Sequence, residues 1–247
     1  MNTGELAQLI RRSTHTVVLT GAGISTAAGI PDFRGPHGIY TTRAYDPEKT
    51  FDIEWFDRDP SIFFAFARDF IPLAERAQPT FAHRFLAELE RQGHVATVMT
   101  QNIDGLHQKA GSTHVLELHG SFQHAHCRNC QTAYTYLELK DKLQAAQLPL
   151  CDACGGVIKP DIVFYGEPVL EMDEAEAEAR AADLFLVMGT SLTVYPAAML
   201  PALTSAPVIL LSRHNGTDGP SGAQVIDRDL DEVCGELLAI LARGHTH

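Results

Sequence analysis

The 247-residue chain lacks long hydrophobic runs. No apolar stretch approaches the roughly 18 residues that a membrane-spanning helix requires; the longest, such as 16–19 and 184–188, are short. The first residues also lack a basic region followed by an apolar core, so we expect no secretory signal. These absences argue against a membrane protein and predict a cytoplasmic one.

An excess of positive charge is also lacking. Nineteen Lys and Arg residues face 31 Asp and Glu residues, which leaves a net charge of −12. Such a chain is a poor candidate for direct nucleic-acid binding and suits basic partners such as lysine-bearing peptides. With 45% hydrophobic and 20% charged residues, the composition is that of a globular protein and excludes collagen-like or disordered chains. The length predicts one large domain, or a large one with a small one.

Short apolar strands alternate with helical segments along the chain, which predicts an α/β fold with a doubly wound parallel sheet. Polar or glycine-rich residues follow several strands, at 21, 101, 189 and 212, where open α/β sheets bind their ligands. The predicted strands are 16–20, 95–100, 116–118, 161–165, 184–188 and 208–211. The predicted helices are 5–12, 60–91 with interruptions at Pro72 and Pro79, 171–182 and 230–241.

A glycine turn follows the first predicted strand. Gly21-Ala22-Gly23 leads into a helix expected near Ser25, as in the phosphate-binding turn of dinucleotide sites. Thr26 replaces the third glycine of that fingerprint, and no acidic residue ends an obvious second strand about 20 residues later. A plain strand-to-helix turn that binds no phosphate therefore remains the alternative interpretation of this segment. The loop 29–35 combines proline, glycine, an aromatic ring and two charges, which is compatible with a surface loop or with a lid over a cofactor.

Five cysteines are an odd number, and four of them form two pairs. Cys127 and Cys130 are separated by two residues, as are Cys151 and Cys154, and 20 residues lie between the pairs. In a reducing compartment this spacing favours a metal over disulfides. Four thiolates complete a tetrahedral zinc shell without an open position, so the pattern predicts a structural zinc-ribbon module, 122–158, inserted between the strands. A redox-active cysteine pair is the alternative.

Polar side chains cluster just past the predicted strand ends: Gln101, Asn102, Asp104, His107 and His119. A histidine at such an edge is a candidate general base because its pKa lies near neutrality. A single histidine is more often structural, so the position alone does not assign this role to His119.

These motifs, in this order, resemble the sirtuin family of NAD-dependent protein deacylases, and the resemblance spans nearly the whole chain, about 16–241. It is carried by the segments 21–25 (GAGIS), 29–35 (GIPDFRG), 100–107 (TQNIDGLH), 118–120 (LHG), 159–167 (KPDIVFYGE) and 189–198 (GTSLTVYPAA), together with the four paired cysteines.

The resemblance implies a Rossmann-like NAD-binding domain and a smaller domain built from two insertions. The large domain would comprise about 1–35, 80–121 and 159–247, and the small domain about 36–79 and 122–158. NAD would be consumed as a co-substrate, and one structural zinc ion would be held per chain. We further expect acetylated-lysine proteins or peptides as partners, no nucleic-acid or membrane partner, and a monomer.

The resemblance also implies which residues contact NAD, in a site that runs from the glycine turn to the adenosine end. These residues would be Gly21, Ala22, Gly23, Thr26, Asp32, Phe33, Arg34, Gln101, Asn102, Ile103, Asp104, His119, Gly189, Thr190, Ser191, Ser212, Arg213, Leu230 and Asp231.

The implied reaction removes an acetyl, or another short or apolar acyl, group from lysine and yields nicotinamide, deacylated lysine and O-acetyl-ADP-ribose. His119 would be the general base toward a ribose hydroxyl, Asn102 would orient water or the ribose, and Asp104 would hold the nicotinamide amide. The peptide would pair as an added strand between two segments: Val163, Phe164, Tyr165, Gly166 and Glu167 on one side, and Thr193, Val194 and Tyr195 on the other.

Several positions depart from the family pattern. Ser212 stands where the family usually has Asn, and Tyr165 stands where Phe is common. Ala67 and Phe70 occupy the places of the Tyr and Arg of members that prefer acidic acyl groups, so we expect short or apolar acyl chains. A mono-ADP-ribosyltransferase and a non-enzymatic NAD-binding sensor are the alternative functions, and the presence of His119 argues against the sensor.

Overall fold

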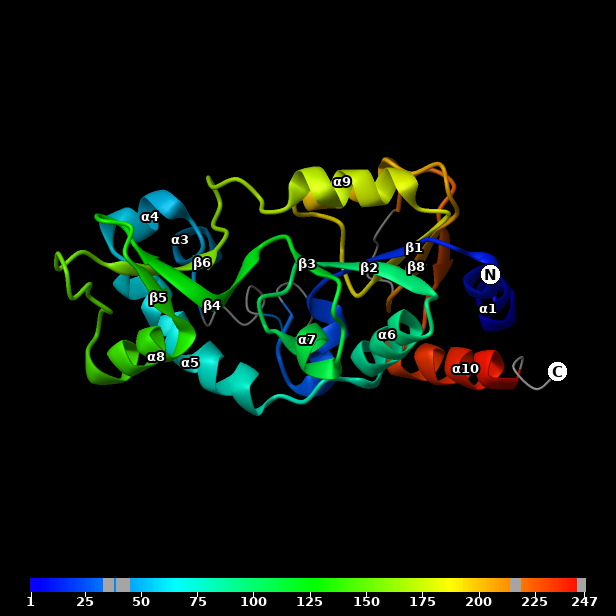
Figure 1. The fold of residues 1–247 in the computed structure, drawn as a ribbon, viewed down its shortest axis with the longest axis horizontal. Helices are drawn as coiled ribbons and strands as arrows, with labels where there is room; N and C mark the ends of the chain where they lie inside the picture. The colour runs from blue at the N-terminus through cyan, green and yellow to red at the C-terminus, as the bar shows by residue number, and fades with distance from the viewer. Residues whose placement is uncertain (33–37, 39–44, 214–218, 244–247) are drawn as a thin grey trace.

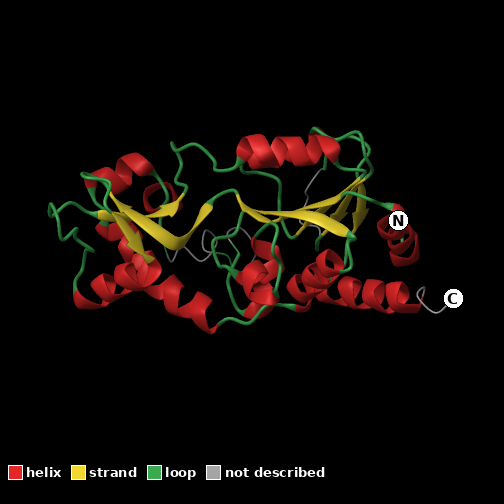
Figure 2. Ribbon diagram, in the orientation of Figure 1, coloured by secondary structure: helices red, strands yellow, loops and turns green. Residues whose placement is uncertain are grey.

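The computed structural model describes residues 1–32, 38, 45–213 and 219–243. Two parts lie side by side along the long axis of the molecule (Figures 1 and 2). One part is built on a six-stranded sheet with helices on both faces, and the other on a three-stranded sheet. None of the described helices is both long and apolar enough to cross a bilayer.

The six-stranded sheet is parallel between all neighbours, in the order β3-β2-β1-β7-β8-β9. Counted along the chain within this sheet, the order is 3-2-1-4-5-6, which is that of a doubly wound dinucleotide-binding fold. The predicted fold class is therefore confirmed, and the order reverses between β1 and β7. The strands are β1 (Thr16–Thr20), β2 (Val95–Thr100), β3 (Val115–Glu117), β7 (Leu184–Met188), β8 (Val208–Leu211) and β9 (Gln224–Ile226).

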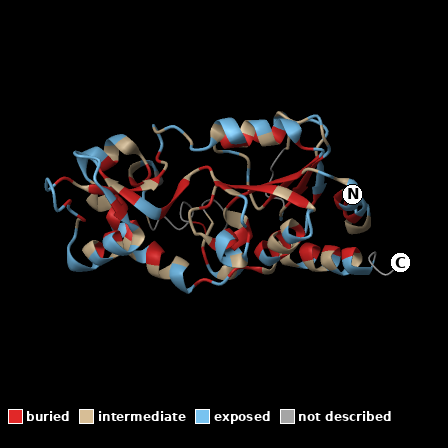
Figure 3. Ribbon diagram, in the orientation of Figure 1, coloured by how far each residue is buried: buried red, intermediate tan, exposed pale blue. Residues whose placement is uncertain are grey.

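The central strands are continuous apolar runs because helices cover both faces of the sheet. All residues of β1, β7 and β8 are buried. Figure 3 shows buried residues along much of the large sheet. One face packs against α1 (Thr3–Arg12), α6 (Phe81–Arg91) and α10 (Leu230–Arg243). The other face packs against α9 (Met172–Ala181) and the short helix η2 (Ala197–Ala202).

The second part has its own apolar core around a cluster of phenylalanine rings. Phe63 and Phe164 have ring centroids 4.9 Å apart, and Phe56 lies 5.4 Å from Phe164. Edge-on and tilted ring pairs of this kind add to the free energy gained from burial. The antiparallel sheet has the order β5-β4-β6. The strands and helices of this second part are β4 (Gly120–Cys127), β5 (Ala133–Thr135), β6 (Ile158–Ile162), α3 (Pro47–Thr50), α4 (Ile53–Arg58), α5 (Ser61–Arg76) and α8 (Tyr136–Ala145).

The structure corrects the predicted bounds of a helix and of a strand. The helix α5 continues through Pro72, because its Phe63, Phe64, Phe66 and Phe70 are buried and their packing outweighs the cost of roughly 3 kcal/mol for an interior proline. The strand predicted over 161–165 is β6, which begins at Ile158 and ends at Ile162, and the turn that follows is closed by the hydrogen bond from the Glu167 amide to the Phe164 carbonyl.

The helix predicted near Ser25 is the 3-10 helix η1 (Ala22–Ala28), and the short strand β9 was not predicted. Only two of the three β9 residues, Val225 and Ile226, are apolar, which is too short a run for a sequence pattern to detect.

Candidate active site

A cavity of about 1030 Å³ opens at the carboxyl ends of β1, β2 and β7, between the two sheets. This volume suits a bound organic ligand. Its lining includes every described residue that the sequence assigns to NAD or to the peptide. The structure thus brings together segments from 21 to 231; Phe33 and Arg34 lie outside the described residues.

The glycine turn after β1 is packed against the turn after β7. The Gly23 amide donates to the Gly189 carbonyl at 2.8 Å, and a Cβ atom on Gly23 would lie 2.8 Å from the Gly189 Cα. Gly189 itself has φ +65°, a backbone conformation that favours glycine. The glycines are therefore required by the contact between the two turns, and the Gly23 amide is already occupied by a protein partner.

Asn102 and Asp104 point at the same corner of the cavity from the loop after β2. The Asn102 Nδ2 atom lies 3.2 Å from both the Gly21 carbonyl and the Ser25 Oγ. The Ser25 hydroxyl donates to Asp104 at 2.7 Å, and the Leu106 amide donates to the same carboxylate at 2.9 Å. Burial raises the pKa of Asp104, and these two hydrogen bonds oppose the rise. Ser25 thus fixes both side chains, a role that its sequence position did not reveal.

A buried polar chain supports Asn102 from behind. The backbone amide of Asn102 donates to the Thr100 hydroxyl oxygen at 3.1 Å, and the Thr20 hydroxyl donates to the same oxygen at 2.9 Å. His107 Nε2 lies 2.9 Å from the Thr20 hydroxyl. Burial lowers the pKa of His107 to about 4, so this ring is neutral near pH 7. The sequence placed His107 with the site residues, whereas it is fully buried and is absent from the cavity lining.

His119 has a defined tautomer. Its Nδ1 atom lies 2.9 Å from the Gln101 carbonyl oxygen, and a carbonyl can only accept, so Nδ1 carries the hydrogen. The other ring nitrogen, Nε2, therefore holds a lone pair. Burial lowers the pKa of His119, although the Gln101 carbonyl opposes the shift. His119 is one of the residues that line the cavity, and a neutral imidazole with an unprotonated nitrogen can act as a general base.

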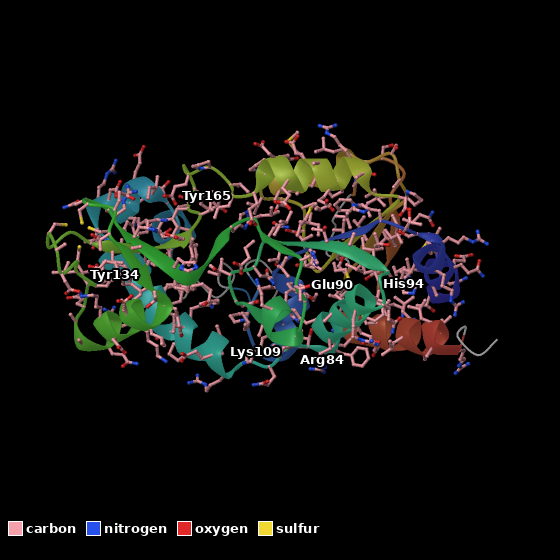
Figure 4. The ribbon with its side chains drawn as sticks, viewed as in Figure 1. Arg84, Glu90, His94, Lys109, Tyr134 and Tyr165 are labelled. Carbon is pink, nitrogen blue, oxygen red and sulfur yellow. The ribbon has the colours of Figure 1, made fainter. Side chains whose placement is uncertain are left out.

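One wall of the cavity is the segment 163–167, which is a turn rather than a strand. The Tyr165 amide donates to the Phe51 carbonyl at 2.7 Å, and the Ile53 amide donates to the Tyr165 carbonyl at 3.1 Å. The Val163 carbonyl and the Gly166 amide have no hydrogen-bond partner among the described residues. Tyr165 is 45% exposed on the loop between the two parts of the molecule (Figure 4).

The opposite wall follows β7 and includes residues 193–195. Gln101 Nε2 donates to the Thr190 hydroxyl at 2.9 Å, and this hydrogen bond joins the loop after β2 to the loop after β7. The Tyr195 side chain is 69% exposed. Tyr165 and Tyr195 therefore both line the cavity and are both exposed to solvent.

The cavity is apolar where the second part contributes to it. The lining there includes Phe51, Phe70, Ile103, Ile162 and Phe164. A surface of this composition accepts an uncharged chain and offers no cation to a carboxylate. Ala67 is buried on α5 and is not in the lining.

At the other end, Ser212 and Arg213 follow β8, and Asp231 is the second residue of α10. The Arg213 guanidinium pairs with Asp229 at 3.1 Å. Asp231 accepts from the backbone amide of Ala82 at 2.9 Å, at the start of α6. Its carboxylate thus stabilises the N-terminus of that helix while also lining the cavity.

The four paired cysteines converge at the far side of the second part. The Sγ atoms of Cys127 and Cys154 lie 3.4 Å apart, those of Cys130 and Cys151 3.6 Å, and all four are within 4.8 Å of one another. Zinc–sulfur bonds of about 2.3 Å in a tetrahedron place sulfur atoms about 3.8 Å apart, so the cluster fits a zinc ion. The Tyr134 hydroxyl donates to the Cys151 sulfur at 3.1 Å, and Figure 4 places Tyr134 in this part.

Comparisons of the sequence and of the fold with known proteins agree with one another. A match to the Sir2 family covers residues 21–196. The chain is similar to the NAD-dependent protein deacetylase of Sulfurisphaera tokodaii, with 48% identity over 81% of this chain and 79% of that protein. It is also similar to the NAD-dependent protein deacetylase of Thermotoga maritima, with 47% identity over 83% and 82% of the two chains. A solved Sir2 structure with a deacetylated peptide and 3'-O-acetyl-ADP-ribose superposes with a TM-score of 0.90 at 40% identity, covering 97% of this chain and 98% of the other.

Proposed function

The chain belongs to the Sir2 family, and from this we propose that it removes acetyl groups from protein lysine side chains while consuming NAD. The observation that carries the proposal is the tautomer of His119, which has an unprotonated Nε2 and is one of the residues that line the cavity that NAD and the peptide would share. The products would be nicotinamide, the free lysine and O-acetyl-ADP-ribose. The names of the relatives do not favour the transferase or sensor alternatives.

Each polar residue of this site has its own role in the proposed reaction. When bound, NAD supplies a ribose carbon from which nicotinamide leaves. His119 accepts the proton of a ribose hydroxyl at Nε2, and its Nδ1–H stays bonded to the Gln101 carbonyl. Asn102 orients water or the ribose, and Asp104 holds the nicotinamide amide. Ser25 keeps these two side chains in fixed positions before NAD arrives.

The peptide would enter between residues 163–167 and 193–195. The Val163 carbonyl and the Gly166 amide offer one acceptor and one donor to its backbone, as in strand addition. The acyl-lysine would reach the apolar lining around Phe70 and Phe164. Acylated-lysine peptides are therefore the proposed partners.

We propose that the four cysteines hold one structural zinc ion, because their spacing fits its tetrahedral shell. The division into a large domain and a small domain is supported by the separate apolar cores of the two parts. A cytoplasmic location and a monomeric state stay predictions from the sequence.

The reaction is tested with an acetyl-lysine peptide incubated with the protein, with and without NAD. Mass spectrometry should show the peptide losing its acetyl group only when NAD is present, together with formation of O-acetyl-ADP-ribose. Labelled NAD without any acylated substrate serves as the control. Transfer of label to protein in that control, with the acetyl peptide unchanged, would favour the transferase instead.

Acyl-chain preference follows from the apolar end of the cavity. We expect acetyl and propionyl peptides to be processed at least about tenfold faster than the succinyl peptide, because burial of an unpaired carboxylate is costly. Phe70 stacks on Phe66 and Phe122. The described residues that line the apolar end of the cavity include no Lys or Arg that could pair with a succinyl carboxylate. Parallel kcat/KM measurements on the three peptides decide the point, and faster removal of succinyl would contradict it.

A further inference from the structure

A buried lysine lies directly behind the wall formed by residues 163–167. Lys159 is on β6 and its side chain is 8% exposed. Its Nζ donates to the Ile162 carbonyl at 2.6 Å, forms an ion pair with Glu167 at 2.8 Å and lies 4.2 Å from the centroid of the Phe164 ring. A buried ammonium group is stable only where partners of this kind replace water.

Glu167 closes the same turn from its other end. The carboxylate oxygen that meets Lys159 also accepts from the Phe164 amide at 2.9 Å. The Glu167 amide donates to the Phe164 carbonyl at 3.0 Å. The ion pair therefore joins the two ends of the segment and fixes the backbone between them.

The outer edge of the turn is held separately, by Phe51 and Ile53 through Tyr165. The Val163 carbonyl and the Gly166 amide, the two groups proposed to bind the peptide, are among the backbone groups of the segment that have no partner among the described residues, and both residues line the cavity. Lys159 contacts neither of them. It fixes the residues on either side, Ile162 and Glu167, so the direction of both groups depends on it.

We propose that Lys159, through its ion pair with Glu167, is a positioning residue for the acyl-peptide substrate. It holds the wall 163–167 in the conformation that binds the peptide backbone and keeps the Phe164 ring in the acyl pocket. This inference rests on the proposed function. Its expected effect is on peptide affinity, because Lys159 is not in the cavity lining and none of its hydrogen bonds or ion pairs is with the residues proposed for NAD at 21–26, 101–104 or 119.

The test replaces the ammonium by an apolar group of similar length, Lys159→Met. We expect the KM for the acetyl peptide, and the dissociation constant of a fluorescein-labelled acetyl peptide measured by anisotropy, to rise roughly ten- to a hundredfold. The KM for NAD and kcat should be unchanged, since an interaction used equally in the ground state and the transition state affects KM alone. A general loss of folded protein would instead lower the apparent kcat and leave both KM values unchanged.

The control is Lys140→Met. Lys140 is also paired with a carboxylate, Glu75 at 2.5 Å, and also lies over an aromatic ring, that of Tyr136, but it is on α8 and not in the cavity lining. It should leave the peptide KM unchanged. Equal effects of the two substitutions on the peptide KM would overturn the proposal.

A second variant covers the case in which Lys159→Met does not fold. Glu167→Gln keeps an oxygen for the Phe164 amide and removes only the charge, and it should raise the peptide KM in the same way. In the double variant the two effects should not add, because both remove one interaction. Unchanged peptide affinity in active single variants would refute the role of Lys159 alone, whereas a wild-type protein that neither binds nor deacetylates the peptide would refute the proposed function and this inference with it.

Discussion

Replacement of His119 by alanine is expected to lower kcat for deacetylation by about a hundred- to ten-thousandfold, the usual contribution of a general base. The lost group is the Nε2 lone pair, which the Gln101 carbonyl keeps free by binding the hydrogen on Nδ1. The fold should persist, because the side chain is half-buried at the cavity and makes this single described hydrogen bond. Binding of NAD, measured by calorimetry, should be retained.

The pH dependence gives a second readout for the same residue. The neutral imidazole is the active form, so kcat/KM should fall as the pH drops through the pKa of His119. Because burial lowers this pKa from 6.5, the acidic limb should lie below the pH of an ordinary histidine. His94→Ala, at a histidine outside the cavity lining, is the matched control and should keep both the rate and the limb. A His119→Ala variant that retains kcat within about tenfold would exclude His119 as the base.

Removal of zinc is expected to abolish activity although none of the four cysteines is in the cavity lining. Structural zinc contributes about 10–16 kcal/mol to the folding of small zinc modules, so its loss should unfold the sheet of β4, β5 and β6. Two of these strands border the active site directly. β4 begins at Gly120, next to His119, and β6 ends at Ile162, next to Val163. Their unfolding would displace the base and the peptide wall together.

Chelation, and separately Cys151→Ser, provide the measurement. The metal content should fall from one zinc per chain, amide hydrogen exchange should rise across 120–162, and turnover should be lost. The large sheet should stay protected because its core is separate. Cys234→Ala is the matched control, since this buried cysteine of α10 is not in the metal cluster, and the variant should keep both zinc and activity. Full activity of metal-free protein would show that the cluster has no such role.

The metal cluster and the central sheet illustrate what local sequence patterns predict well. Each cysteine pair is separated by two residues, and a tight turn presents both thiols on one side whatever the rest of the chain does. Similarly, a run such as Leu184–Met188 can be satisfied only where both faces of a strand are covered. The strand prediction depends on neighbouring residues and the metal-cluster prediction on two such pairs 20 residues apart, and both agree with the structure.

Predictions that depended on distant partners were less successful. Pro72 does not end α5, because phenylalanines on that helix pack against Phe122 and Phe164, far along the chain. Positions past strand ends grouped His107 with His119, and only the family resemblance assigned the role of general base to His119. Only the packing of α6 and α7 (Leu106–Ala110) buries His107 beside His83, with ring centroids 4.7 Å apart, and leaves His119 at the cavity.

The sequence by itself determined the parallel α/β fold, the zinc cluster and, through the order of its motifs, the segments that surround the cavity. The tertiary structure decided how individual groups are used: which histidine nitrogen is free, that Gly23 is required by Gly189, and that Lys159 supports the wall of the groove. The physical reason is that strands, helices and paired cysteines arise from neighbouring residues, whereas the tautomer, pKa and orientation of a side chain depend on burial and on hydrogen-bond partners that only the folded chain brings within reach.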